Sequence, residues 1–234
     1  MVITVGVLAL QGAFVEHLSL LRKAEGYLKQ SGRVGHEFSF VQVRNAEQLG
    51  ECDGLIIPGG ESTTISLVAA NSGLLEPLRS FVKIERKPTF GTCAGLILLS
   101  ETAIATKQGG QELIGGLDVQ VNRNHFGRQV QSFKAELDLP FLAQSTTRQP
   151  FPGVFIRAPV VEKVLPQAEG KHAAMSSPVE IMGVLPGTGD AEATIIAVKQ
   201  GNVFGTSFHP EMTSDVRIHA WWLEQVIKAA AVEQ

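Results

Sequence analysis

The chain opens on a continuous apolar run at residues 2–10, and shorter apolar runs recur at residues 53–58 and 88–91. Such runs are typical of parallel strands that are covered on both faces. Residues 13–28 follow the first run with apolar side chains at helical spacing. Strands that alternate with helices predict an α/β fold with a doubly wound, mostly parallel central sheet flanked by helices.

Beyond Leu99 the apolar runs become shorter and are joined by turns, which predicts an additional antiparallel β region in the second half. A buried strand returns at residues 203–208, and a terminal helix over residues 214–232 takes Ser214 or Asp215 as its N-cap. The other expected elements are strands at 38–43, 117–121, 129–137, 153–157, 179–185 and 194–199, helices from 62 and over 74–84, and surface loops at 144–152 and 168–178.

Composition fits one folded domain over residues 1–234. The charged fraction of 18% is below the usual value of about a quarter, which suggests that part of the surface is covered by a partner. The formal net charge is −3 and no run of Lys or Arg occurs, so binding to nucleic acid or to an anionic membrane is disfavoured. Two cysteines, with no secretory or membrane-spanning pattern, favour a reduced, cytoplasmic location.

The run Gly-Thr-Cys-Ala-Gly at residues 91–95 follows an apolar strand and leads into a helical pattern. This arrangement predicts a nucleophile elbow, in which Cys93 projects from a sharp turn between strand and helix. The helix that begins near Ala94 directs its positive end at the sulfur and favours the reactive thiolate. A cysteine considered alone is more often a small buried hydrophobe, and Cys52 is interpreted in that way.

A second cluster, His209-Pro210-Glu211, follows the expected strand at 203–208. If that strand lies beside the elbow strand, His209 can accept a proton from Cys93 and later protonate a leaving amine. Glu211 is placed to hold the tautomer of the imidazole. The three residues therefore predict acyl-transfer chemistry. A metal site built from the same residues is the alternative, but it lacks a fourth ligand at a sensible spacing, and no metal is expected.

The run Pro-Gly-Gly-Glu-Ser-Thr at residues 58–63 ends a strand and opens a helix. Its functional interpretation is an oxyanion hole, with one N–H from Gly60 and the other from Ala94, the residue after the nucleophile. A plain Gly-Gly turn with a Ser/Thr helix cap, or a phosphate-binding loop, is the alternative, although the Lys of a P-loop is missing.

Taken together, these motifs resemble the glutaminase subunits of pyridoxal 5'-phosphate synthase, the vitamin B6 branch of the class I glutamine amidotransferases. The resemblance covers nearly the whole chain, and it implies the flavodoxin-like fold of that class with no cofactor. The motifs that carry it are Leu-Ala-Leu-Gln-Gly at 8–12, Pro-Gly-Gly-Glu-Ser-Thr-Thr at 58–64, Gly-Thr-Cys-Ala-Gly-Leu at 91–96, Arg-Asn-His-Phe-Gly-Arg-Gln at 123–129, Gly-Val-Phe-Ile-Arg-Ala-Pro at 153–159 and Phe-His-Pro-Glu at 208–211.

The resemblance implies that Cys93 attacks the side-chain amide of L-glutamine, that ammonia leaves, and that water hydrolyses a γ-glutamyl thioester. A zwitterionic substrate needs donors for its carboxylate and acceptors for its ammonium group, which agrees with the residues implied to bind it. Considered alone, each arginine among them is more often a structural ion-pair partner. The implied glutamine-binding residues are Gly60, Glu61, Ser62, Arg123, Ile156 and Arg157.

The same resemblance implies a synthase partner, arranged as a ring, that consumes the ammonia within a large hetero-oligomer. It places the turn at Gln11 and Gly12 near the oxyanion region and the partner surface, so the partner is expected to complete the site. Residues 27–38, 144–150 and 163–179 depart from the shortest family members as insertions. Another class I amidotransferase, a γ-glutamyl hydrolase, or a catalytically silent subunit of the same assembly are the competing functions.

Overall fold

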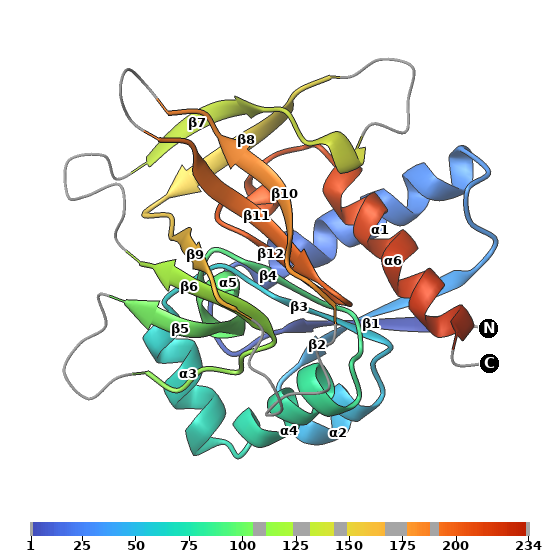
Figure 1. The fold of residues 1–234 in the computed structure, drawn as a ribbon. Coiled ribbons are helices and arrows are strands. Elements are labelled where there is room, and N and C mark those ends of the chain that lie inside the picture. Colours follow the sequence, from blue (N-terminus) through green and yellow to red (C-terminus); the bar gives the residue numbers. More distant parts are fainter. Residues whose placement is uncertain are drawn as a thin grey trace.

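The computed structural model describes residues 2–104, 111–123, 132–142, 149–166, 177–187 and 192–232. Strands and helices alternate in the first part of the chain, as the sequence predicts (Figure 1). Its elements are β1 (Val2–Leu8), α1 (Phe14–Gln30), β2 (Glu37–Val43), α2 (Ala46–Gly50), β3 (Gly54–Ile57), α3 (Ser62–Asn71), α4 (Leu75–Arg79), the π-helical turn η1 (Ser80–Ile84), β4 (Thr89–Thr92) and α5 (Ala94–Leu99).

The second part of the chain is mostly β-structure and ends in a long helix. Its described elements are β5 (Ser100–Ile104), β6 (Leu117–Asn122), β7 (Ser132–Leu137), the 3-10 turn η2 (Pro140–Leu142), β8 (Phe151–Ile156), β9 (Val160–Val164), β10 (Glu180–Leu185), β11 (Thr194–Gln200), β12 (Val203–Thr206), the 3-10 turn η3 (Pro210–Met212) and α6 (Arg217–Val232).

Within the described ranges, one ten-stranded sheet has the order β2-β1-β3-β4-β12-β11-β9-β6-β5, with β10 paired to β11. Strands β2, β1, β3, β4 and β12 are parallel to one another, which confirms the predicted doubly wound core. Strand β12 comes late in the sequence and yet pairs directly with β4. The last parallel strand is therefore placed beside the strand that leads into the predicted elbow.

The predicted antiparallel region is also present, in two parts. Strands β9, β10 and β11 continue the central sheet through antiparallel pairs, while β7 and β8 form a separate antiparallel pair. Two strands and one helix were missed by the sequence patterns: β5, β9 and α2. Each is only five residues long, too short to show a clear period. The predicted helix over 74–84 is divided between α4 and η1.

Several expectations fall on parts of the chain that lie outside the described residues. They include most of the motif at 123–129, the start of the strand expected at 129–137, most of the loops at 144–152 and 168–178, and parts of the insertions at 144–150 and 163–179. The insertion at 27–38 is described, and it connects the end of α1 to β2.

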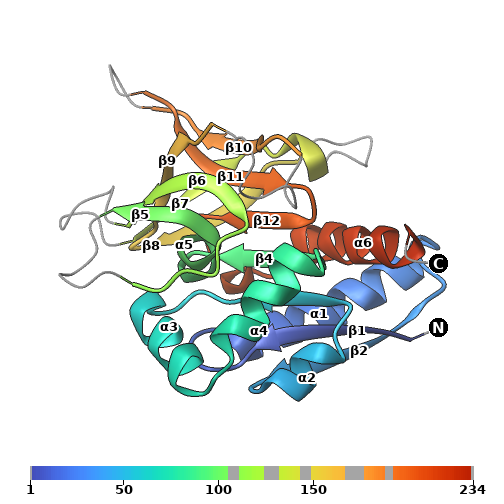
Figure 2. The same cartoon turned by 60° about the horizontal axis from the view of Figure 1, so that its bottom comes forward.

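Two apolar clusters lie on opposite faces of the parallel strands. Helices α1 and α6 cover one face and pack against each other, while α3, α4 and α5 cover the other (Figures 1 and 2). In β3, Ile56 belongs to the cluster that α1 and α6 cover, whereas Leu55 and Ile57 belong to the cluster that α3, α4 and α5 cover. Because neighbouring side chains of a strand point to opposite faces, an apolar strand of this kind needs both layers of helices.

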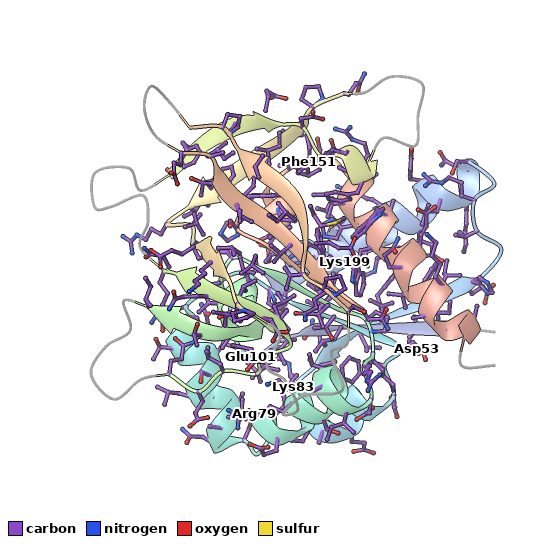
Figure 3. The ribbon with its side chains drawn as sticks, in the orientation of Figure 1. Asp53, Arg79, Lys83, Glu101, Phe151 and Lys199 are labelled. Carbon is purple, nitrogen blue, oxygen red and sulfur yellow. The ribbon has the colours of Figure 1, made fainter. Side chains whose placement is uncertain are left out.

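Polar contacts hold the outer part of the second layer to the sheet. Lys83 of η1 and Glu101 of β5 form an ion pair of 2.9 Å between Nζ and Oε1, and the two lie close together in Figure 3. Arg79 of α4 donates Nε–H to the carbonyl of Leu113 at 2.9 Å. Among the helices described, none combines the length and apolar character that crossing a bilayer requires.

Candidate active site

The predicted elbow is present at the end of β4. Cys93 stands between β4 and α5 with φ +48° and ψ −100°, a conformation that costs a non-glycine residue roughly 1–3 kcal/mol. The two glycines around it allow close packing: a Cβ on Gly91 would lie 2.5 Å from the carbonyl carbon of Gly95, and one on Gly95 would collide with the carbonyl oxygen of Ile57. The glycines therefore have the packing role that the sequence pattern predicts.

Strand β12 brings His209 to the elbow. Thr92 and Thr206 are paired in the parallel β4–β12 ladder, and the N–H of Cys93 donates to the carbonyl of Thr206 at 2.8 Å. His209 follows three residues later, and its N–H donates to the carbonyl of Val154 in β8 at 2.8 Å. The expected neighbourhood of the two strands is confirmed. The hydrogen bond that joins the backbone of His209 to β8 was not predicted.

His209 lies beside Cys93 on one side and is hydrogen-bonded to Glu211 on the other. Its Nδ1 is 2.7 Å from Oε1 of Glu211, and the residue is only 8% exposed. Burial by itself would lower the pKa of His209, but the hydrogen bonds and charges of Cys93 and Glu211 raise that pKa to about 10. At neutral pH the imidazole of His209 therefore carries a proton.

Glu211 is buried at the start of η3, with its side chain at 0% exposure. Burial would raise the pKa of its carboxyl group, but His17 and His209 together hold that pKa below its usual range. A carboxylate therefore faces the imidazole at neutral pH. This is the orientation that the spacing His-Pro-Glu predicts, because a carboxylate at Nδ1 leaves the other ring nitrogen for the sulfur.

The loop between β3 and α3 adjoins the same histidine. A Cβ on Gly59 would collide with the His209 ring and would lie 3.4 Å from Oε1 of Glu211. Ala94 is the first residue of α5, and N–H groups in the first turn of a helix have no acceptor within the helix. The two backbones expected to supply an oxyanion hole, at Gly60 and Ala94, thus belong to segments that both border the elbow.

The turn at Gln11 and Gly12 packs directly on this loop. The side-chain oxygen of Gln11 accepts the N–H of Glu61 at 2.8 Å, and Ala13 donates its N–H to the carbonyl of Gly59 at 3.1 Å. Gly12 has φ +102°, and a Cβ there would collide with the same carbonyl oxygen. The turn and the loop that carries Gly60 are therefore in backbone contact.

The residues implied to bind glutamine fall into two groups, and the first lies at the start of α3. Glu61 caps α3 by accepting the N–H groups of Thr63 and Thr64. Nη2 of Arg123 lies 3.4 Å from Oε1 of Glu61, so these two are neighbours. Ser62 is 2% exposed and donates its hydroxyl to Oε1 of Gln111 at 3.1 Å. The Ser62 side chain is thus engaged in the interior.

The second group lies at the end of β8. The carbonyl oxygen of Ile156 is 4.0 Å from Sγ of Cys93, and the side chain of Ile156 is 38% exposed. Arg157 follows with φ +45°, one of the positive φ values found outside glycine among the described residues. Strained backbone conformations of this kind cluster at functional sites, and this one lies next to the residue that contacts Cys93.

The sequence interpretation missed two histidines behind Glu211. His17 in α1 and His219 in α6 are both fully buried, and Nε2 of His17 is 3.4 Å from Oε2 of Glu211. Helical spacing could have identified them, because each lies on the apolar stripe of its helix, with Leu21 four residues after His17 and Leu223 four after His219. Over the described ranges, no three His, Cys, Asp or Glu side chains are grouped to hold a metal ion.

Comparison with known proteins places this site in context. The chain is 46% identical over 233 residues to a probable pyridoxal 5'-phosphate synthase subunit PDX2 of Arabidopsis thaliana, covering 94% of this chain and 85% of that protein. It is 44% identical over 229 residues to a pyridoxal 5'-phosphate synthase subunit PdxT of Corynebacterium jeikeium, covering 98% and 99%. A crystal structure described as a glutamine amidotransferase superposes with TM-score 0.71 at 38% identity, covering 95% and 98%.

The match to the family is equally extensive, since the family description SNO glutamine amidotransferase applies to residues 7–228. That range contains the elbow, the Gly-Gly loop, the turn at Gln11 and Gly12, and the His-Pro-Glu cluster. On the evidence of its fold and of this match, the chain belongs to the SNO glutamine amidotransferase family.

Proposed function

We propose that this protein hydrolyses L-glutamine to L-glutamate and ammonia, as the glutaminase subunit of a pyridoxal 5'-phosphate synthase. The observation that carries the proposal is the contact chain Cys93–His209–Glu211, formed at a strained elbow in a chain of this family. The names of the relatives supply the synthase. A cytoplasmic location and one glutaminase domain over residues 1–234 belong to the same proposal; the two unpaired cysteines and the continuous sheet support them.

In the first half of the reaction, Sγ of Cys93 attacks the side-chain carbonyl carbon of glutamine. A carbon–sulfur bond forms, and the carbonyl oxygen becomes an oxyanion that the N–H groups of Gly60 and Ala94 stabilise. The carbon–nitrogen bond then breaks, and His209 gives its proton to the nitrogen, which leaves as ammonia. The product on the enzyme is a γ-glutamyl thioester. Glu211 keeps Nδ1–H of His209 in place throughout.

In the second half, His209 takes a proton from water while the oxygen attacks the thioester carbon. The carbon–sulfur bond breaks, glutamate leaves, and the proton returns to the pair formed by Cys93 and His209. We assign recognition of the substrate's α-carboxylate and α-ammonium groups to the neighbours Glu61 and Arg123 and to the backbone near Ile156, with Arg157 and the backbone of Ser62 beside them. The opposite charges of Glu61 and Arg123, 3.4 Å apart, and the 4.0 Å contact between the carbonyl of Ile156 and Sγ of Cys93 support the assignment.

The synthase is proposed to activate this site through the turn at Gln11 and Gly12. The hydrogen bond from Glu61 N–H to Gln11 and that from Ala13 N–H to Gly59 join this turn to the loop that carries Gly60. A partner that moves the turn would therefore move an oxyanion donor. Equal glutamine turnover with and without the synthase would contradict this part of the proposal.

The experiment that tests the function is glutamate release from glutamine, measured with and without a candidate synthase. Cys93→Ala is expected to abolish hydrolysis and to retain binding to the synthase, while the matched variant Cys52→Ala keeps full activity. Cys52 is suited to this control because burial raises the pKa of its thiol to about 11 and it donates to the carbonyl of Gln48 at 3.2 Å. Full activity of Cys93→Ala would refute the assigned nucleophile.

The competing functions give different results in the same assay. A catalytically silent subunit would bind the synthase and release no glutamate. A γ-glutamyl hydrolase would act on γ-glutamyl peptides in preference to free glutamine, and its rate would not depend on the synthase. Another class I amidotransferase would deliver ammonia to a different acceptor.

A further inference from the structure

A buried chain of polar side chains continues from the triad into the core. Beyond Glu211 come His17 of α1 and His219 of α6, each with 0% exposure. Nε2 of His17 is 3.4 Å from Oε2 of Glu211 and 3.2 Å from Oγ1 of Thr92, and its Nδ1 is 2.9 Å from Nε2 of His219. The elements that carry these residues are far apart in the sequence, so the alignment depends on the packing of α1 against α6.

The second carboxylate oxygen of Glu211 requires a donor. Oε1 is engaged by His209 at 2.7 Å, whereas Oε2 is buried and makes no hydrogen bond of ordinary length within the described part of the chain. A buried acceptor that bears charge and has no donor is costly. The N–H that can face it is the one on Nε2 of His17, at 3.4 Å.

This requirement fixes the tautomers of both histidines. If Nε2 of His17 carries the hydrogen, then Nδ1 is an acceptor, and the hydrogen in its 2.9 Å contact must come from Nε2 of His219. Nδ1 of His219 then carries a lone pair and no hydrogen, and it is the nitrogen of that ring without a hydrogen-bond partner among the described residues. In this assignment the Nε2–H of His17 is shared between Oε2 of Glu211 at 3.4 Å and Oγ1 of Thr92 at 3.2 Å, and Nδ1 of His219 is an acceptor without a partner in the described part of the chain.

Both rings are neutral in this arrangement. Burial lowers the pKa of His17, although the charge of Glu211 acts in the opposite direction. Burial also lowers the pKa of His219 well below its usual value, and His17 adds to that effect. The titratable groups that face His17 are Glu211 of η3, His209, His219 of α6 and Glu16 of its own helix, while β4 presents the uncharged Thr92 and Phe90.

We propose that His17 is a positioning residue of the triad, donating Nε2–H to the free oxygen of Glu211 while His219 holds His17 in the required tautomer. This inference rests on the proposed glutaminase function of the same site. Because both of its oxygens then accept a hydrogen bond, the Glu211 carboxylate cannot rotate away from Nδ1 of His209. The other ring nitrogen of His209 therefore stays directed at Cys93. The role belongs to a donor at one atom, and simple filling of space does not supply it.

The test compares His17→Gln with His17→Met, two unbranched side chains of similar length. Gln retains an N–H donor near the position of Nε2, whereas Met has none. With synthase present, we expect His17→Met to lower kcat roughly 10- to 100-fold, the range for loss of an outer hydrogen-bond partner of a site residue. The KM for glutamine should change less than about twofold, because this positioning acts on the chemical step rather than on binding. His17→Gln should stay within about threefold of wild-type kcat.

The dependence of kcat on pH separates positioning from packing. Without a donor on Oε2 the charged form of Glu211 is less stable, so the acid limb of the profile should move to higher pH in His17→Met and return toward wild type in His17→Gln. The same two substitutions at His36, in the segment between α1 and β2, should leave kcat and profile unchanged. Equal loss in folded His17→Gln and His17→Met would overturn the proposal, as would full activity of His17→Met.

A measurement on the unmodified protein keeps the proposal testable if neither variant folds. Long-range proton–nitrogen correlation spectra of the imidazole rings at pH 7.5 report which nitrogen of each histidine is protonated. We expect His17 and His219 to be protonated on Nε2 only; a hydrogen on Nδ1 of His17 would refute the proposal. These spectra do not depend on turnover. Wild-type protein that releases no glutamate with synthase would instead refute the proposed function and leave the tautomer result standing.

Discussion

The packing of the elbow against β3 makes a quantitative prediction for Gly95→Ala. Gly95 lies in the first turn of α5, and an added Cβ would collide with the carbonyl oxygen of Ile57 and lie 3.3 Å from that residue's Cβ. The collision is with backbone at the center of the sheet, which no rotamer change relieves. Overpacking of this kind costs about 1–3 kcal/mol. It opposes the gain of up to about 1 kcal/mol that Ala normally brings to a helix interior.

Gly26→Ala is the matched control, because Gly26 lies inside α1 with nothing within 4 Å of an added Cβ. For a chain of this length 1 kcal/mol shifts Tm by about 2–4 °C. Gly26→Ala should therefore raise Tm by about 1–4 °C, and Gly95→Ala should lower it by up to about 8 °C after the helix gain is subtracted. Both shifts are measured by thermal unfolding followed by circular dichroism.

Gly95→Ala should also lower the rate of glutamine hydrolysis, because Gly95 is two residues from Cys93. Moving α5 away from β3 displaces the sulfur and the N–H of Ala94 relative to His209. Misplacement by about 1 Å can cost about 100-fold in rate, so we expect kcat for glutamine hydrolysis to fall at least roughly tenfold in Gly95→Ala. Gly26→Ala should keep wild-type kcat. If Gly95→Ala is as stable and as active as Gly26→Ala, the close packing of the elbow is not what requires glycine there.

Three further outcomes follow from the site. Gly12→Ala places a Cβ against the carbonyl of Gly59 at φ +102°, so synthase-dependent glutamate release should fall and Tm should drop by a few degrees, about 1–3 kcal/mol. Arg123→Met should raise the KM for glutamine by about tenfold or more with a smaller effect on kcat, since a charge-assisted hydrogen bond contributes about 1.5–3 kcal/mol; an unchanged KM would remove Arg123 from the binding site. In urea unfolding, the free energy of unfolding should decrease as pH falls below about 6.5, by up to about 1.4 kcal/mol per pH unit for each buried histidine. The reason is that the folded state lowers the pKa values of His17 and His219, so unfolding takes up protons in this range. The free energy of unfolding should also decrease as pH rises from about 6.5 toward 10, because the protonated His209 stabilises the folded state and loses its proton over this range. A free energy of unfolding that stays constant from about pH 5.5 to 9.5 would contradict both the acid and the alkaline prediction.

The parallel half of the fold could be predicted from the sequence because its strands are apolar on both faces and end at glycine turns. The elbow could be predicted for a related reason: Gly91 and Gly95 leave room for backbone contacts that any side chain would obstruct. Spacing along the chain also placed Glu211 correctly relative to His209, because two residues separated by a proline stay close in any fold.

Long-range neighbours were harder to predict. The hydrogen bond from His209 N–H to Val154 joins the residue before η3 to a strand of the separate two-stranded sheet, and no local pattern encodes that pairing. His17 was missed because its importance comes from α6 and η3, which pack on α1 only in the folded chain. The short strands β5 and β9 owe their conformation to pairing with β6, so the sequence signal for each is weak.

The insertion of β12 between β4 and β11 also determines when the protein can become reactive during synthesis. Cys93 leaves the ribosome more than a hundred residues before His209, its proposed base, and until then one edge of β4 has no partner. The nascent chain thus carries an incomplete sheet edge and a cysteine without its imidazole. Glutamine cannot be hydrolysed wastefully by an unfinished chain, and a nonsense mutation anywhere before codon 209 should leave a product that is inert toward glutamine and prone to strand-edge association.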